Sequence, residues 1–139
     1  MKPKVEIKNI LEAPNLLELK HRFGVTEKET IIAYGDKIYC PNAGMSKDLL
    51  VHEMMHCERQ NFSADSAKRW WKMYLEDESF RLQEEIIAYQ NQYAYCCAIY
   101  KDRNKRVKIL SALASELSSS RYGKIIIHSE AMHKIKIVV

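Results

Sequence analysis

The sequence predicts an α+β fold: one domain over residues 1–139, mostly helical, with a small antiparallel β-hairpin. Proline and glycine are scarce, with 3 and 4 copies, which favours long helices over a turn-rich β fold. Two β-rich segments, Thr30–Tyr34 and Lys37–Cys40, flank Gly35-Asp36, a pair typical of a hairpin turn. The length of 139 residues, with 47% hydrophobic and 29% charged residues, suits a single globular domain.

The remaining elements follow from local patterns along the chain. Before the hairpin, Lys4–Ile7 predicts a short strand, and Leu16–Arg22 predicts a helix that ends at Gly24. After the hairpin, Ser46 is the expected N-cap of a helix that runs to about Gln60. Further along we expect helices at Lys68–Leu75, Ser79–Tyr100 and Val107–Leu117, a strand-like run at Ile125–Ile127, and a short last helix capped by Ser129.

The charged residues and the cysteines narrow the classes of partner. The net charge of +4 is scattered along the chain and does not by itself favour a nucleic-acid partner. A basic run from Lys101 to Arg106 is interpreted as a solvated helix end, and a nucleic-acid-binding regulator that uses it is a third hypothesis.

The four cysteines form no C-x-x-C pair, which favours a reduced, cytoplasmic setting. Because residues 1–6 lack the apolar stretch of a secretory signal and the apolar runs are short, we expect no membrane partner.

The sequence HEMMH at residues 52–56 places two histidines four residues apart on a predicted helix. Residues at this spacing share a face one turn apart, so His52 and His56 can bind one zinc ion. Glu53 lies at the flank of that face, where its carboxylate can take a proton from a metal-activated water. We expect Leu50 and Met54 on the buried opposite side of the helix. The alternative is two ordinary helix histidines.

A catalytic zinc needs three protein ligands and an open position, so a third donor is required. The candidates are Glu84 and Glu85 on the long predicted helix from Ser79. Glu85 is preferred because Ala88 and Tyr89 share its face, and a small alanine there permits close approach of the metal-bearing helix. Glu84 would then face solvent. The alternatives are that Glu84 replaces Glu85, or that both are surface glutamates.

Together these motifs resemble the gluzincin branch of zinc metallopeptidases, and more closely the small single-domain metallopeptidases common in phage and prophage genomes. The resemblance spans about Ile31 to Tyr89, through HEMMH, Trp70-Trp71 and the segment Glu85–Tyr89. It implies a zincin-like domain in which His52, His56 and Glu85 bind zinc and Glu53 is the general base. It also implies an edge strand before the active-site helix that pairs with an extended peptide, for which Lys37–Cys40 would serve.

The resemblance implies a zinc-dependent peptidase, with endopeptidase favoured over exopeptidase and a peptide or protein as substrate. The alternative is a zinc-stabilised, non-catalytic binding or regulatory module of phage origin. The sequence leaves open the substrate, the cleavage preference and the oligomeric state. It also leaves open which side chain stabilises the oxyanion, a role that gluzincins give to a downstream histidine or tyrosine. The candidates are Tyr89, Tyr93, Tyr122, His128 and His133.

Overall fold

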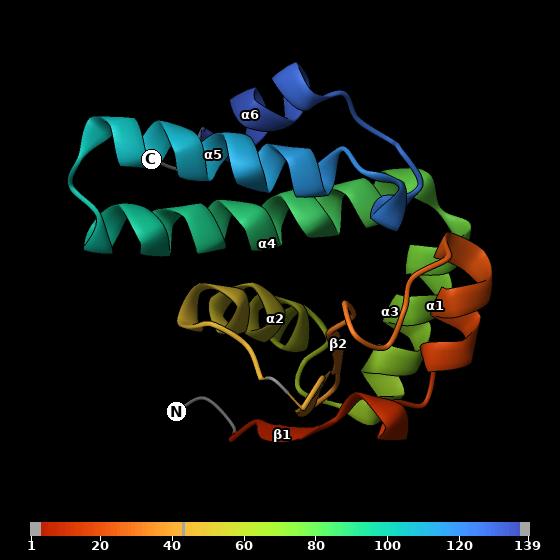
Figure 1. Cartoon of the computed structure of the whole chain (residues 1–139). Helices are drawn as coiled ribbons and strands as arrows, with labels where there is room; N and C mark the ends of the chain where they lie inside the picture. Colours follow the sequence, from red (N-terminus) through yellow and green to blue (C-terminus); the bar gives the residue numbers. More distant parts are fainter. Residues whose placement is uncertain (1–3, 43, 137–139) are drawn as a thin grey trace.

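The computed structural model describes residues 4–42 and 44–136, and it is mostly helical with one small three-stranded sheet (Figure 1). This arrangement agrees with the predicted α+β class. The elements in chain order are β1 (Glu6–Asn9), the 3₁₀ turn η1 (Ile10–Glu12), α1 (Leu16–Phe23), β2 (Ile32–Tyr34), β3 (Lys37–Cys40), α2 (Lys47–Arg59), α3 (Ala64–Glu76), α4 (Glu78–Ile99), α5 (Arg103–Leu117), the 3₁₀ turn η2 (Ser120–Tyr122) and α6 (His128–Lys136).

The predicted hairpin is confirmed, because β2 and β3 pair antiparallel around Gly35-Asp36. Gly35 is needed there for two reasons. Its φ of 66° lies in the left-handed region, which costs other residues energy. A Cβ at Gly35 would also lie 2.9 Å from the backbone nitrogen of Ala64, a distance too short for a real contact. The turn therefore packs directly against the beginning of α3.

The order of strands differs from the sequence expectation. The sheet has the order β1-β3-β2, and β1 pairs with β3 in parallel, so the sheet is mixed rather than purely antiparallel. Strand β3, Lys37–Cys40, is therefore the central strand, and the prediction that it is the free edge for a peptide is wrong. A strand that pairs on both sides has no backbone groups left for a further partner. The edge strand next to α2 is β2.

Helices α2, α4, α5 and α6 form successive layers on one side of the sheet, and α1 and α3 lie beside these layers (Figure 1). Helix α2 packs on β2 and β3, α4 packs along α2, and α5 and α6 cover the other side of α4. The buried residues of the main core come from every one of these helices except α2. Trp70 and Trp71 of α3 are both buried, since α3 contacts both β2 and α4. The main apolar core therefore receives no side chain from α2, and the interface between α2 and α4 is of a different kind.

Two expectations in the C-terminal part need correction. The run Ile125–Ile127 forms no strand; it connects η2 to α6 on the helical side of the molecule, away from the sheet (Figure 1). Ile125 and Ile126 pack against the core as part of this connection. The described sheet contains only β1, β3 and β2, so the backbone of this segment joins no ladder of hydrogen bonds. The last helix begins at His128, before the predicted cap. Within the described residues, none of the helices has the length and apolar character that a membrane crossing requires.

Candidate metal centre

Helix α2 buries its two histidines and Glu53, and Cys57 is its one fully buried apolar residue. The buried residues of this helix are His52, Glu53, His56 and Cys57, whereas the side chain of Leu50 is 36% exposed. The expectation that Leu50 forms the buried side is therefore wrong, because α4 lies across the histidine face. Met54 is partly buried on the sheet side.

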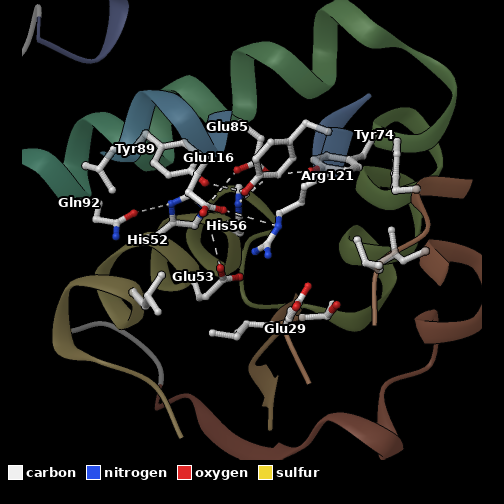
Figure 2. A pocket seen from close by; sticks show the side chains of 18 of the residues that line it. Glu29, His52, Glu53, His56, Tyr74, Glu85, Tyr89, Gln92, Glu116 and Arg121 are labelled. Atoms are coloured by element: carbon white, nitrogen blue, oxygen red, sulfur yellow. Dashed lines mark hydrogen bonds and ion pairs between the residues drawn. The ribbon is translucent and has the colours of Figure 1, made fainter. Parts of the chain in front are cut away.

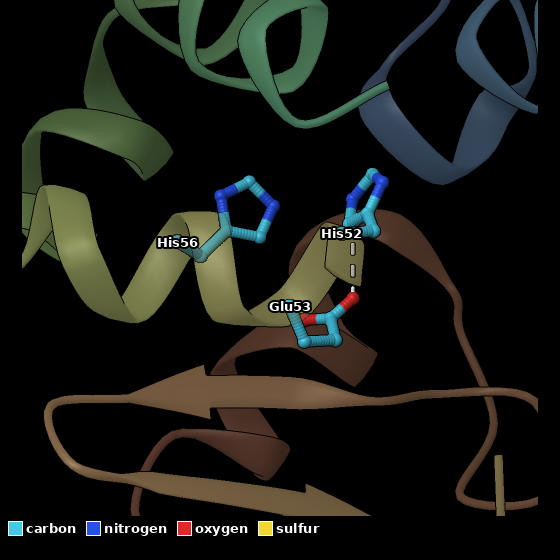
Figure 3. Close-up of side chains that lie close together, drawn as sticks. All are labelled: His52, Glu53 and His56. Atoms are coloured by element: carbon cyan, nitrogen blue, oxygen red, sulfur yellow. Dashed lines mark ion pairs between the residues drawn. The ribbon is translucent and has the colours of Figure 1, made fainter. Parts of the chain in front are cut away.

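The group His52, Glu53 and His56 could hold a metal ion. One potential ligand atom from each residue lies within 4.8 Å of the other two, and all three residues are buried. Figure 3 shows both imidazoles on one side of α2, with Glu53 at the flank of the helix. The two rings meet edge to face, with centroids 4.9 Å apart. The helical spacing that the sequence indicated thus brings the two rings together.

Glu85 reaches the same point from α4. Its Oε1 lies 3.1 Å from Nε2 of His52, and its Oε2 lies 3.2 Å from Nε2 of His56. The hydroxyl of Tyr74 donates a hydrogen bond of 2.7 Å to Oε2. Burial raises the pKa of the Glu85 carboxyl, but the two imidazoles outweigh burial and hold this pKa well below its usual range. The carboxylate is therefore ionised and oriented by three neighbours.

Glu84 does not point to solvent, and that expectation is wrong. Its residue is 2% exposed, and its carboxylate accepts hydrogen bonds of 3.1 and 2.8 Å from Nε and Nη2 of Arg59. The indole of Trp70 donates a further bond of 2.8 Å. Both oxygens of Glu84 are thereby occupied by α2 and α3. Of the two adjacent glutamates, the structure brings Glu85 to the histidines and ties Glu84 to Arg59.

Glu53 differs from Glu85 in its electrostatic surroundings. Its Oε2 lies 3.9 Å from Nε2 of His52, farther than either oxygen of Glu85 from its imidazole. Burial raises the pKa of Glu53 to about 8, and the nearby carboxylate of Glu85 adds to the rise while His52 opposes it. A carboxyl with such a pKa can accept and release a proton near neutral pH.

The donor set and its spacing are compatible with a metal ion such as zinc. Two imidazole nitrogens and a carboxylate are ligands that zinc commonly takes. Ligand atoms on a tetrahedral zinc with bonds of about 2.0–2.1 Å lie roughly 3.3 Å apart, close to the 3.1 and 3.2 Å between Glu85 and the two Nε2 atoms. Nδ1 of His56 is buried and has no hydrogen-bond partner among the described residues, whereas Nδ1 of His52 lies 3.0 Å from Oε1 of Gln92.

A cavity of about 370 Å³, which Figure 2 shows from close by, is lined by His52, His56, Glu53 and Glu85. Its wall also contains Arg121, together with Glu29 and Glu116 at exposed positions. The Nε atom of Arg121 lies 3.7 Å from Oε2 of Glu116. These three charged residues were not found from the sequence, because they come from separate loops and helix ends with no spacing that links them to the histidines.

Two of the five proposed oxyanion residues line this cavity, namely Tyr89 and Tyr122. Their hydroxyls lie 2.7 Å apart, and burial raises the pKa of both well above the ordinary value for tyrosine. The buried guanidinium of Arg81 donates through Nε to the carbonyl of Tyr122 at 2.9 Å, which anchors η2. Within the described residues, Tyr93, His128 and His133 lie outside the cavity wall.

No protein-family model, curated protein or solved structure matches this chain. The chemistry of the centre is therefore inferred from its own residues. Sequence reasoning missed Tyr74, which contacts Glu85, and Gln92, which contacts His52. It also missed the partner of Gln92, which is Asp48. Gln92 follows Glu85 by two turns of α4 on the same face, so helical spacing was a signal that could have found it.

Proposed function

We propose that this protein is a zinc-dependent peptidase of the zincin-like type. The observation that carries the proposal is the position of the Glu85 carboxylate, 3.1 and 3.2 Å from Nε2 of His52 and His56, in the wall of a 370 Å³ cavity. His52, His56 and Glu85 would hold the metal. Zinc, when bound, polarises a substrate carbonyl and acidifies a water molecule.

The side chains around the metal ligands have distinct proposed tasks. Glu53 takes the proton from the attacking water on its carboxylate and delivers it to the leaving amine. Its position supports this task. Glu53 lies beside His52, whereas the closer contact with Nε2 of His56 is made by Glu85. Tyr89 and Tyr122 keep their protons at neutral pH, so one of them can donate a hydrogen bond to the negative charge that develops on the carbonyl oxygen.

The corrected strand order and the hydrogen bonds of β2 support a place for the substrate beside residues 29–31. In the middle of β2, the carbonyl of Ala33 accepts hydrogen bonds from Trp71 at 3.0 Å and from Gln60 at 3.2 Å. A peptide is therefore excluded from that part of the β2 edge. The preceding residues 29–31 line the cavity. We propose that an extended substrate lies along these residues, with its scissile carbonyl towards Glu53.

The test compares wild-type protein with Glu53→Gln. The variant should retain one zinc per chain by elemental analysis while losing cleavage of a peptide library. Glu58→Gln, an exposed position on the same helix, serves as the matched control and should cleave like wild type. Cleavage by Glu53→Gln at the wild-type rate would remove Glu53 from its role. Absence of zinc from wild-type protein purified without chelators would overturn the proposal.

The depth of the centre favours a second candidate, a zinc-stabilised module without catalysis. His52, His56 and Glu85 are each 3% exposed, and they join α2 to α4, so a metal there would stabilise the fold as a structural site does. In this case chelation would unfold the protein, and no peptide in the library would be cut by the zinc-loaded form. Cleavage that disappears in Glu53→Gln would exclude this alternative.

A further inference from the structure

Behind His52 lies a second layer of hydrogen bonds. Gln92 of α4 is 2% exposed, and its Oε1 lies 3.0 Å from Nδ1 of His52. The amide nitrogen of the same side chain donates a bond of 2.8 Å to Oδ2 of Asp48, in the first turn of α2. Gln92 is thus held between an aspartate and a histidine that belong to the same neighbouring helix.

The chemistry of these three groups fixes the direction of each hydrogen bond. An ionised carboxylate only accepts hydrogen bonds, so Asp48 must face the NH₂ group of Gln92. Burial raises the pKa of Asp48, but hydrogen bonds from Ser46, Gln92 and the backbone outweigh it and keep this pKa below the usual value. The amide oxygen of Gln92 is then left to face His52, and an amide oxygen requires a proton on the nitrogen opposite it.

We propose that Gln92, oriented by Asp48, is a positioning residue that holds a proton on Nδ1 of His52 and so directs Nε2 to the metal. The proposal rests on the metal site of the proposed function, but it does not require catalysis. A histidine that binds metal through one nitrogen donates the other N–H to an acceptor, which fixes the orientation of the ring. Here the acceptor is a neutral amide with a carboxylate behind it.

The other histidine provides an internal contrast. Nδ1 of His56 is buried without a hydrogen-bond partner among the described residues, so no comparable pair of side chains holds a proton on Nδ1 of that ring. His56 instead packs against the indole of Trp70, with ring centroids 5.2 Å apart. Replacement of Gln92 should therefore change His52 and leave the ring of His56 nearly unaffected.

The first measurement needs no metal. In ¹⁵N-labelled, metal-free protein at neutral pH, Nε2 of His52 also faces an acceptor, the Glu85 carboxylate at 3.1 Å, so the readout specific to Gln92 is at Nδ1. Nδ1 of His52 should show the chemical shift of a protonated nitrogen and a slowly exchanging proton. In Gln92→Met, which keeps the length of the side chain, this proton should exchange rapidly. The matched control is Gln90→Met on the same helix, where the amide donates to the carbonyl of Lys134; its His52 signal should equal that of wild type. An unprotonated Nδ1 in wild-type protein would overturn the proposal.

The second measurement is zinc affinity by competition with a chelator. Gln92→Met should bind zinc about 10- to 100-fold more weakly, as the loss of a group behind a ligand usually does. The double variant Asp48→Asn/Gln92→Glu exchanges the amide and the carboxylate but retains an acceptor at Nδ1, so it should return towards wild-type affinity. A packing role alone would not predict this recovery. Equal affinity of Gln92→Met and wild type would also overturn the proposal.

The two proposals fail in different ways. If the wild-type protein shows the protected Nδ1 proton yet holds no zinc, the peptidase proposal fails while the orientation of His52 by Gln92 stands. If zinc binds and peptides are cut but Gln92→Met changes neither the proton nor the affinity, the role of Gln92 fails and the peptidase proposal stands.

Discussion

Helix α4 has two different faces. One packs in the apolar core, and the other carries the polar residues of the candidate metal centre. Towards α2 it presents Glu84, Glu85 and Gln92, each with hydrogen-bonded partners. Its contribution to the main apolar core includes Ile86, Tyr93 and Cys97, and the partner residues from α5 and α6 are Leu110, Leu113, Ala114, Leu117, Ala131 and Ile135.

Burial has different consequences on the two faces of α4. Apolar burial stabilises the fold roughly in proportion to the area removed from water. Buried carboxylates cost desolvation energy, which their partners offset only if every hydrogen bond is made. A fold that needed only stability would place apolar residues between α2 and α4. The polar interface between α2 and α4 is therefore not explained by stability alone, and it is what the proposed metal site requires.

The largest effect on folding is expected on the apolar face. Leu117 of α5 is fully buried, so Leu117→Ala should lower the free energy of unfolding by about 2–5 kcal/mol. Leu11→Ala, at a residue that is 70% exposed, is the matched control and should change it by less than about 0.5 kcal/mol. Urea denaturation of metal-free protein measures both. A small effect at Leu117 would mean that α5 contributes little to the core.

The next largest effect is expected on zinc affinity. It should differ between the two adjacent glutamates on the polar face of α4. Glu85→Gln should weaken zinc binding more than about 100-fold, since loss of a group behind a ligand alone costs about 10- to 100-fold. Glu84→Gln should leave zinc affinity unchanged but lower the free energy of unfolding by about 1–3 kcal/mol, because it weakens the bonds to Arg59 and Trp70. Chelator competition and urea denaturation measure the two quantities.

The opposite pattern would reverse the assignment of these residues. If Glu84→Gln lost zinc and Glu85→Gln kept it, the metal ligand would be Glu84, and the geometry of the metal-free site would have to change on binding.

The sequence predicted the parts of the site that depend on one helix. The positions of His52, Glu53 and His56 follow from the period of α2, and the preference for Glu85 followed from the face it shares with Ala88. The burial of Glu84 could not be predicted, since its partners Arg59 and Trp70 belong to two other helices. Residues that meet only through tertiary packing leave no periodic signal.

The fold shows the same division between local and distant information. The hairpin followed from Gly35-Asp36, and Gly24 ends α1 in the left-handed conformation, as a C-cap glycine does. The central place of β3 was missed because it depends on the parallel pairing with β1, which the chain reaches only after α1 and β2. The run Ile125–Ile127 was assigned to a strand from its composition, yet among the described residues it pairs with none of the three strands.

The smallest effect on folding is expected for a polar contact in the cavity wall. Tyr122→Phe removes one of two hydroxyls that lie 2.7 Å apart, and should lower the free energy of unfolding by about 1 kcal/mol. Tyr100→Phe, at a residue that is 37% exposed, is the control. If the hydroxyl of Tyr122 also stabilises the transition state, kcat should fall while KM stays near the wild-type value. A stability loss as large as that of Leu117→Ala would instead show that the polar wall carries the fold, and the division between the two faces of α4 would not hold.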